Sequence, residues 1–323
     1  MELGEQDVKD KSEVIHRILA NIAKVFVGKE DQIRVLLTGF SAGLHVLIED
    51  VPGVGKTTLA RCLAASVGLD MGRIQFTPDL LPGDIVGMTI WSQEKREFVY
   101  KQGAIMHQFL LADEINRASP RTQSSLLEAM QEQSVTVDGQ THKLPQPFFV
   151  IATQNPVNFL GAFALPEGEL DRFGVSFSLG YPGVTEEGEI LGRFQEADPL
   201  LGLESVAEDE EIIKIREMVR SVFVDEKMKA YIVQISKNTR GNRNLKLGLS
   251  PRASLHLLLG SQATALLRGR AFVIPEDVLT IAPYVLAHRV ILSSEAQMNN
   301  LTARDVIKRV IDSVPIPTGL NEE

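Results

Sequence analysis

The chain has 323 residues, of which 44% are apolar, and a formal net charge of −9. Its length allows a sizeable buried core and favours two domains over one. The acidic balance disfavours a protein whose main task is to coat nucleic acid or an anionic membrane surface.

The N-terminal segment, MELGEQDVKDKSEV, is charged and has no apolar core of the kind found in signal peptides. No apolar run in the chain approaches the ~18 residues that a membrane span needs. We therefore expect no membrane span and a cytoplasmic location. Apolar residues at helical spacing predict an amphipathic helix over residues 12–23, with Ser12 as its N-cap, and a second helix that reaches Leu37.

The stretch HVLIEDVPGVGKTTLA, residues 45–60, joins a short apolar strand to a glycine-rich turn and a helix that starts at Lys56. In this arrangement the backbone N–H groups of the loop and the positive end of the helix surround the phosphates of a nucleotide. Lys56 is expected to reach the β and γ phosphates, and the Thr57 hydroxyl to bind Mg²⁺. The predicted nucleotide-binding residues of the loop are Pro52, Gly53, Val54, Gly55, Lys56, Thr57 and Thr58.

Residues beside this loop also bear on the nucleotide. Asp50 stands where the strict phosphate-loop pattern has its first glycine, and because Asp tolerates a left-handed backbone we interpret it as a tolerated turn residue. Upstream, the turn at Val27 and Gly28 either covers the adenine or is a plain connector. Cys62 is the single cysteine, which excludes an internal disulfide, fits a reduced compartment and is expected to be a buried structural residue.

Two segments have the pattern of β-hairpins. MTIWSQEKREFVY alternates apolar and polar residues around a polar tip at 93–96, and we expect Trp91 and Phe98 on its arms to pack the hairpin onto the domain, with contact to a partner as the alternative. SVTVDGQTHKL alternates in the same way and is closed by Asp138 and Gly139, a strong turn signal. One domain is therefore predicted to bear two hairpin insertions.

Two further apolar strands end in polar residues. The strand at 107–112 ends in Asp113 and Glu114, which it directs to the carboxyl edge of a parallel sheet, where ligands of open α/β sheets bind. We expect Asp113 to hold Mg²⁺ and Glu114 to activate a water molecule. The strand at 148–153 ends in Gln154, Asn155 and Pro156, where the Asn155 amide either binds a water or phosphate or only forms a loop.

The chain changes character at Tyr181-Pro182-Gly183, which we predict to be a domain boundary. Residues 1–182 are then a nucleotide-binding core and residues 183–323 a smaller all-helical domain, with helices expected at 186–194, 210–222, 226–239, 251–267, 275–292 and 303–314. Arg252 breaks a local rule, because it puts a cation at the positive end of the helix that Ser250 caps. Such a misfit is expected at a functional site, and we expect Arg252 to reach for a phosphate.

The ordered motifs DVPGVGKTT, FLLADEINRASPRTQSSLLEAMQE, VDG, ATQNP, LPEGELDRF and GLSPRAS resemble the MoxR family of AAA+ ATPases. The resemblance extends from about Val27 to Arg289, and it implies an α/β fold: a P-loop AAA+ core with a parallel sheet, plus a smaller all-helical lid. One departure is GAFALPEGELDRF, which replaces the family's usual GTYPLPEAQLDRF.

The resemblance also implies roles for single residues. Asn155 is similar to the residue that senses the γ-phosphate, Arg172 to the arginine finger that completes a neighbouring subunit's site, and Arg252 to the phosphate sensor of the lid. In such relatives the protein is an ATPase that binds ATP and Mg²⁺ and forms a ring, typically a hexamer. The hairpin insertions then face the pore or the partner.

The function that the resemblance implies is Mg²⁺-dependent ATP hydrolysis, coupled to chaperone-like remodelling, maturation or cofactor insertion of a partner protein, often one with a von Willebrand factor A domain. Two alternatives belong to other classes. One is an ATP-switched assembly module with little turnover. The other, a nucleic-acid remodelling ATPase, is disfavoured by the acidic balance of the chain.

Overall fold

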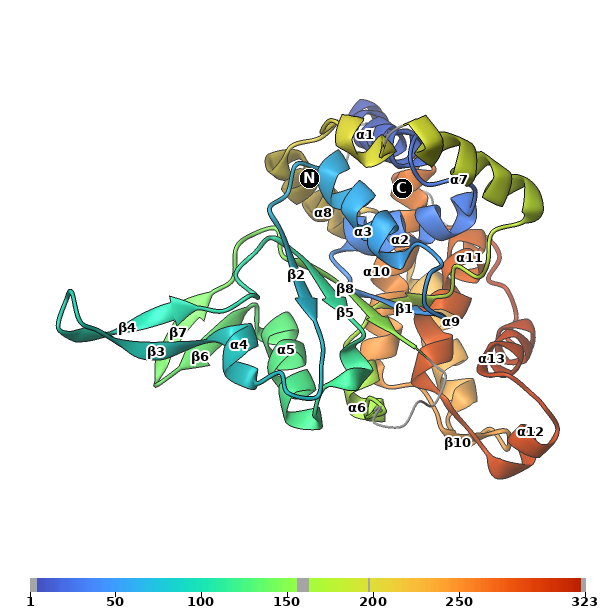
Figure 1. Cartoon of the computed structure of the whole chain (residues 1–323). Helices are drawn as coiled ribbons and strands as arrows, with labels where there is room; N and C mark the ends of the chain where they lie inside the picture. The colour runs from blue at the N-terminus through green and yellow to red at the C-terminus, as the bar shows by residue number, and fades with distance from the viewer. Residues whose placement is uncertain (1–4, 156–162, 197, 321–323) are drawn as a thin grey trace.

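The computed structural model describes residues 5–155, 163–196 and 198–320, and is built around a five-stranded parallel sheet (Figure 1). The strands lie in the spatial order β2-β5-β8-β1-β9. They are β1 (Val46–Glu49), β2 (Met71–Gln75), β5 (Phe109–Asp113), β8 (Phe149–Gln154) and β9 (Val175–Phe177). All four pairings are parallel, so the carboxyl ends of the strands meet at one edge of the sheet.

Helices cover both faces of the sheet. Successive side chains of a strand point to opposite faces, so Val46 and Ile48 belong to one buried cluster and Leu47 to the other. The first cluster includes residues of α1 (Glu5–Ala23), α2 (Glu30–Ala42) and α3 (Lys56–Ser66), and the second includes residues of α4 (Pro82–Val86) and α5 (Pro120–Glu132). Both faces are therefore apolar, which explains why the central strands are apolar runs without alternation.

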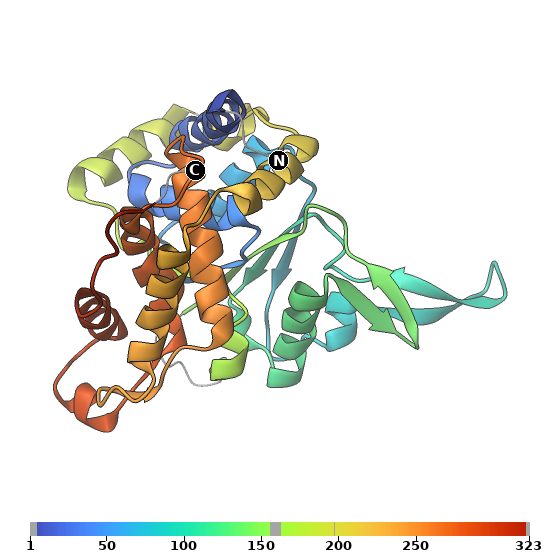
Figure 2. The ribbon, with the colours of Figure 1, turned by 180° about the vertical axis from the view of Figure 1, so that it is seen from behind.

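The second half of the chain is mostly helical and shares the first of these clusters. Its longest helix, α10, lies in front of the sheet in the view of Figure 2, among the other helices of this half, and its buried residues join the cluster that includes α2. The helices are α6 (Glu167–Leu170), α7 (Val184–Glu196), α8 (Asp209–Ser221), α9 (Glu226–Thr239), α10 (Pro251–Leu267), α11 (Pro275–Leu286), α12 (Ser294–Met298) and α13 (Ala303–Asp312). Short 3₁₀ turns are η1 (Ile115–Arg117), η2 (Pro199–Gly202) and η3 (Ala287–Arg289).

Two expectations about helices are wrong. Helix α1 begins at Glu5, so Ser12 is not its N-cap; the Ser12 hydroxyl instead donates a hydrogen bond to the Leu267 carbonyl at 3.0 Å. The helix expected over 275–292 ends at Leu286, and the chain continues into η3 and the strand β11 (Ile291–Leu292). This strand pairs antiparallel with β10 (Leu245–Leu247), so the second half also contains a short ribbon that the helical pattern did not reveal.

The two predicted hairpins are confirmed, and both project from the same side of the sheet (Figures 1 and 2). Their strands are β3 (Gly87–Ser92) with β4 (Glu97–Gln102), and β6 (Ser134–Val137) with β7 (Gln140–Lys143). Asp138 and Gly139 both have positive φ, 49° and 79°, as a two-residue hairpin turn requires. The hairpins contact each other through the stacked rings of Tyr100 and His142, whose centroids are 3.8 Å apart.

The aromatic pair on the first hairpin is exposed. Trp91 is 53% and Phe98 71% exposed, and their rings meet edge to face at 5.2 Å. They therefore pack against each other and do not anchor the hairpin on the domain as expected, because the hairpin extends beyond the body of the molecule (Figure 1). Contact with a partner stays a prediction.

Two further findings concern the chain as a whole. Cys62 is fully buried, and burial raises the pKa of its thiol to about 12, as suits an inert structural cysteine. Within the described ranges, no helix combines the length and the apolar character needed to cross a membrane. The division of the chain at residue 182 stays a prediction.

Candidate functional site

The glycine-rich loop follows β1 at the carboxyl edge of the sheet. Gly53 and Gly55 have φ of 86° and 92°, a left-handed backbone that favours glycine, and α3 begins directly afterwards at Lys56. A Cβ at Gly53 would meet no atom within 4 Å, so this side of the turn faces open space. The sequence therefore forms the concave turn and helix start that were predicted.

Lys56 is buried beside this turn. Its ammonium donates to the backbone oxygens of Asp50 at 2.5 Å and Val51 at 3.3 Å. Burial lowers the pKa of Lys56, while three carboxylates oppose the shift, those of Asp50, Asp113 and Glu114. The lysine therefore lies in the field of the predicted acidic pair, although the acids follow a different strand.

Asp50 has a role that differs from the one expected. Its backbone is not left-handed, and its carboxylate is an acceptor for four groups. Oδ1 accepts from the N–H of Val51 at 2.8 Å, and Oδ2 accepts from Ser178 Oγ at 2.8 Å, Leu179 N at 2.7 Å and Gly180 N at 2.6 Å. Burial acts to raise the pKa of Asp50, but these hydrogen bonds outweigh it and the pKa lies below its usual value. Asp50 fastens the start of the loop to the segment that follows β9.

Asp113 ends β5, two strands away from the loop. Its Oδ2 lies 2.8 Å from Arg73 Nη2, and its Oδ1 accepts from Thr153 Oγ1 at 2.6 Å. The same Thr153 oxygen accepts the N–H of Glu114 at 2.9 Å, so one hydroxyl on β8 positions both acids. Sequence reasoning missed Arg73 and Thr153, because each lies within a strand and its partner comes from another strand.

Glu114 has a left-handed backbone, φ 55°, which is unusual for a residue other than glycine, asparagine or aspartate. Such a conformation costs on the order of 1–3 kcal/mol and is found most often at functional sites. Its Oε2 accepts from Gln75 Nε2 at 3.2 Å and from Arg117 Nη1 at 2.9 Å. The carboxylate is thus held by Gln75 at the end of β2 and by Arg117 of η1.

Asn155 follows β8, and β8 lies between β5 and β1 in the sheet. Asn155 therefore stands between the acidic pair and the phosphate loop, and its backbone oxygen accepts from Asn116 Nδ2 at 3.0 Å. Pro156 and the start of the GAFA segment, Gly161 and Ala162, lie outside the described residues.

A cavity of about 250 Å³ opens beside the loop. Its walls come from the turn before α2, from the loop and α3, and from α7; they include Phe26, Val27, Gly55, Thr58, Ile190 and Phe194. Gly28 lies next to this wall with φ 68°, where any Cβ would clash with the Glu186 carboxylate of α7. Sequence reasoning found Val27 and Thr58 but missed Phe26, Ile190 and Phe194, which are ordinary apolar residues of their segments.

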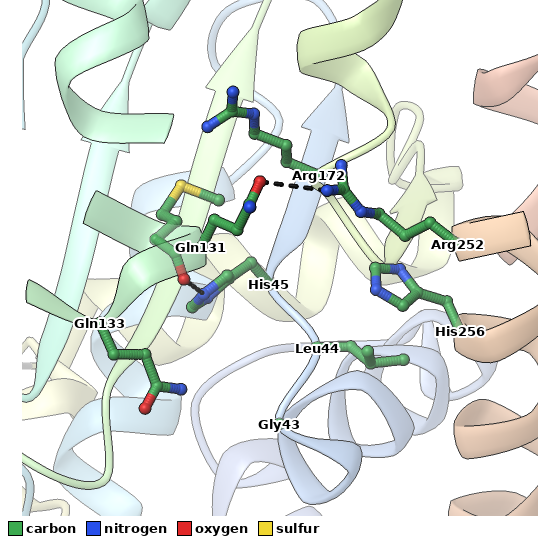
Figure 3. Close-up of a pocket in the computed structure, with 9 residues that line it drawn as sticks. Gly43, Leu44, His45, Gln131, Gln133, Arg172, Arg252 and His256 are labelled. Atoms are coloured by element: carbon green, nitrogen blue, oxygen red, sulfur yellow. Dashed lines mark hydrogen bonds between the residues drawn. The ribbon is translucent and has the colours of Figure 1, made fainter. Parts of the chain in front are cut away.

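Arg172 and Arg252 line a different cavity, of about 170 Å³ (Figure 3). Its walls include Gly43, Leu44 and His45, which precede β1, whereas the phosphate loop follows β1. Five residues of extended chain separate His45 from Asp50, or roughly 16 Å. The structure thus brings the two predicted arginines together and places both away from the phosphate loop of the same chain.

The contacts of these arginines keep them at this cavity. Arg252 Nη2 donates to Gln131 Oε1 at 3.1 Å, as Figure 3 shows, and Arg252 Nη1 lies 3.6 Å from Asp171. Arg172 Nε lies 2.9 Å from Glu169 Oε2. The expectation that Arg252 reaches for a phosphate stays a prediction.

The histidines of this cavity are neutral. Burial lowers the pKa of His45 to about 4, and burial, followed by the charges of Arg289 and Arg252, lowers the pKa of His256 to about 2. Among the described residues that line the cavity, the charge at neutral pH therefore belongs to Arg172 and Arg252. An anionic group is the ligand that such a cavity favours.

Comparison with known proteins decides the family. Residues 45–175 match the ATPase family associated with various cellular activities (AAA), and residues 237–310 match the AAA lid domain. The chain is 37% identical to Chaperone MoxR1 of Mycobacterium tuberculosis, over 97% of this chain and 85% of that protein. The chain belongs to the MoxR family of AAA+ ATPases.

Two further proteins match over nearly the full length. The chain is 45% identical to the uncharacterized protein YeaC of Bacillus subtilis, over 96% of this chain and 97% of that one. Its structure is similar to that of a proposed ATPase from Cytophaga hutchinsonii, with a TM-score of 0.90, 35% identity and coverage of 97% and 98%. The P-loop core with a parallel sheet and a helical lid, predicted from the motifs, is confirmed.

Proposed function

We propose that this MoxR protein hydrolyses ATP with Mg²⁺ and uses the energy for chaperone-like remodelling, maturation or cofactor insertion of a partner protein in the cytoplasm. One observation supports the hydrolysis above all: parallel strand ends bring the phosphate loop, Asp113, Glu114 and Asn155 to a single edge of the sheet. A phosphate-binding turn beside a carboxylate that is carried on a strained backbone is suited to the attack of water on a phosphoanhydride.

The donor groups of this chain fit Mg²⁺. The Asp113 carboxylate and the Thr57 hydroxyl are hard oxygen ligands of the kind that this ion prefers. When bound, the ion would neutralise charge on the phosphates. Lys56 would exchange its two backbone acceptors for β and γ phosphate oxygens, to which its ammonium is a point-charge donor.

The proposed roles of Glu114, Asn155 and the cavity beside the loop follow from where each lies in the structure. Glu114 would orient the attacking water and accept its proton, and Asn155, between loop and acids, would hold the γ-phosphate or that water by a hydrogen bond. The apolar cavity beside the loop would take the base, with Phe26 and Val27 on one side and Ile190 and Phe194 of α7 on the other.

Arg172 and Arg252 are proposed to act on the nucleotide of a neighbouring subunit. Their cavity lies at the opposite end of β1 from the loop, so a head-to-tail contact between two copies would place it against the neighbour's phosphates. A heterologous contact closes into a ring when its rotation closes, and we propose that this contact does so as a hexamer. The arginines would stabilise the charge of the transition state.

For the client, we propose a protein that contacts the projecting hairpin, on which Trp91 and Phe98 are exposed. A protein with a von Willebrand factor A domain is the class that the family resemblance favours. In this proposal, ATP hydrolysis at the nucleotide site drives a conformational change, and the hairpin transmits this change to the client protein.

Steady-state phosphate release tests the hydrolysis. With ATP and Mg²⁺, we expect turnover per subunit to rise with protein concentration, since a site completed by its neighbour needs assembly, and to vanish with EDTA. Tight ATP binding without phosphate release at any concentration would contradict the proposal and favour an ATP-switched assembly module.

A further inference from the structure

The segment that includes Arg172 is fixed to the lid by the residue before it, Asp171. Both carboxylate oxygens of Asp171 lie 3.0 Å from Ser250 Oγ, at the N-cap of α10. Oδ1 also lies 3.2 Å from Arg289 Nη1, and Oδ2 lies 3.6 Å from Arg252 Nη1. The Asp171 carboxylate thus connects the segment that carries Arg172 to two parts of the lid, the start of α10 and η3.

Arg289 is the buried partner of this carboxylate. Its side chain is 1% exposed, in η3 after α11. Its Nη2 donates to the Phe173 carbonyl and to His256 Nδ1, the latter at 2.6 Å, so His256 must be neutral there. Burial lowers the pKa of Arg289 to about 10, with Asp171 acting against the shift, so Arg289 is charged at neutral pH.

The contacts of Asp171 and Arg289 determine how Arg172 and Arg252 are held at their shared cavity. Arg172 belongs to the core and Arg252 to the lid, and two cations at one cavity repel each other. Asp171 offsets this repulsion, and Arg289 holds both Asp171 and the backbone of Phe173, on either side of Arg172. The planar fork of a guanidinium is needed to satisfy acceptors in several directions, which an ammonium on a flexible stem does not reproduce.

We infer that Arg289 and Asp171 are positioning residues for the neighbouring subunit's ATP site: they hold the finger segment and the start of α10 together, so that Arg172 and Arg252 reach one phosphate group. This inference rests on the proposed trans role of the two arginines. Neither positioning residue lines the cavity beside the phosphate loop of its own chain, so we expect both to act on the next subunit.

A second ion pair in the lid, with a buried carboxylate, supplies a matched control. Arg270 Nη2 lies 2.6 Å from Oδ1 of Asp277, which is 0% exposed. This pair resembles Arg289 and Asp171 in chemistry, but it links residues seven positions apart within the lid and does not contact Arg172 or Arg252. Arg270→Lys should therefore affect stability but keep ATP turnover.

Mixed rings separate a positioning role from a structural one. Arg289→Lys alone is expected to lose about tenfold or more in kcat, with KM for ATP changed by less than about threefold, because its own phosphate loop is intact. Mixed with Lys56→Ala subunits, whose arginines are intact, it should regain activity. Mixed with Arg172→Ala subunits, it should regain none, because both variants lack a working finger. Asp171→Asn, which keeps the Ser250 hydrogen bond but not the charge, should behave in the same way.

The outcomes are distinguishable. A reference mixture of Arg172→Ala and Lys56→Ala tests the trans role itself; if it regains no activity, the proposed function of Arg172 and this inference both fall. If the reference mixture is active while folded Arg289→Lys and Asp171→Asn keep wild-type turnover, or are rescued by Arg172→Ala subunits, only the inference is overturned. Thermal unfolding of each variant verifies folding, and Asp171→Asn decides the question if Arg289→Lys does not fold.

Discussion

Replacing Glu114 by glutamine is expected to lower ATP turnover by about 100-fold or more, while ATP affinity stays within about threefold. The amide has nearly the shape of the carboxylate and can keep the contacts with Gln75 and Arg117, but it cannot accept a proton from water. Phosphate release at saturating ATP measures the first effect, and equilibrium binding of ATP measures the second.

The matched control is Glu128→Gln, the same chemical change at an exposed position of α5. It should leave both measurements unchanged. If Glu114→Gln hydrolysed ATP at the wild-type rate, Glu114 would not be the base, and the strained backbone at this residue would need another explanation.

Replacing Asp50 by alanine is expected to have the second large effect. The change leaves three N–H groups and the Ser178 hydroxyl without their acceptor, and each unsatisfied buried donor costs about 1–3 kcal/mol. We expect a loss of about 3 kcal/mol in the free energy of unfolding and about tenfold weaker ATP binding, because the loop is no longer fixed to residues 178–180. Denaturant unfolding and ATP titration measure the two effects.

The Asp50 contribution should also depend on pH. Its folded pKa is lowered, so its stabilisation is present above the unfolded pKa, about 3.9, and is lost as the pH falls through the folded value. The control is Asp305→Ala, which removes a carboxylate that accepts from Thr302 at the exposed start of α13. Asp305→Ala should cost some stability but leave ATP affinity unchanged; an equal loss of ATP affinity in both variants would contradict the role of Asp50.

Features that depend on neighbours in the sequence could be predicted. Lys56 after its glycines, Asp113 and Glu114 after an apolar strand, and the Asp138-Gly139 turn all follow from a few adjacent residues, and the structure contains each of these local features. That the ends of these strands meet at one edge then follows from the parallel pairing of the sheet.

Features that depend on contacts between residues far apart in the sequence could not be predicted. Asp50 accepts from residues about 130 positions away, so its sequence context suggested only a turn. Ser12 resembled a cap because a hydroxyl before an apolar pattern has the same local signal as one that bonds to Leu267. The alternation around Trp91 showed a hairpin but not which of its faces the domain covers.

The placement of Arg252 illustrates the same limit. A cation in the first turn of a helix indicated a phosphate, but the direction in which it points depends on how α10 packs against the core. Only the structure places it beside Arg172, at the end of β1 that lies away from the phosphate loop.

The most direct test of a shared site mixes Arg172→Ala and Lys56→Ala subunits at fixed total concentration and measures phosphate release across the ratios. Each variant alone should be nearly inactive. In randomly assembled rings at equal fractions, an intact loop meets an intact finger at about a quarter of the interfaces, so activity should pass through a maximum there. Activity that never exceeds the weighted sum of the two pure variants, in rings shown to contain both, would contradict the account.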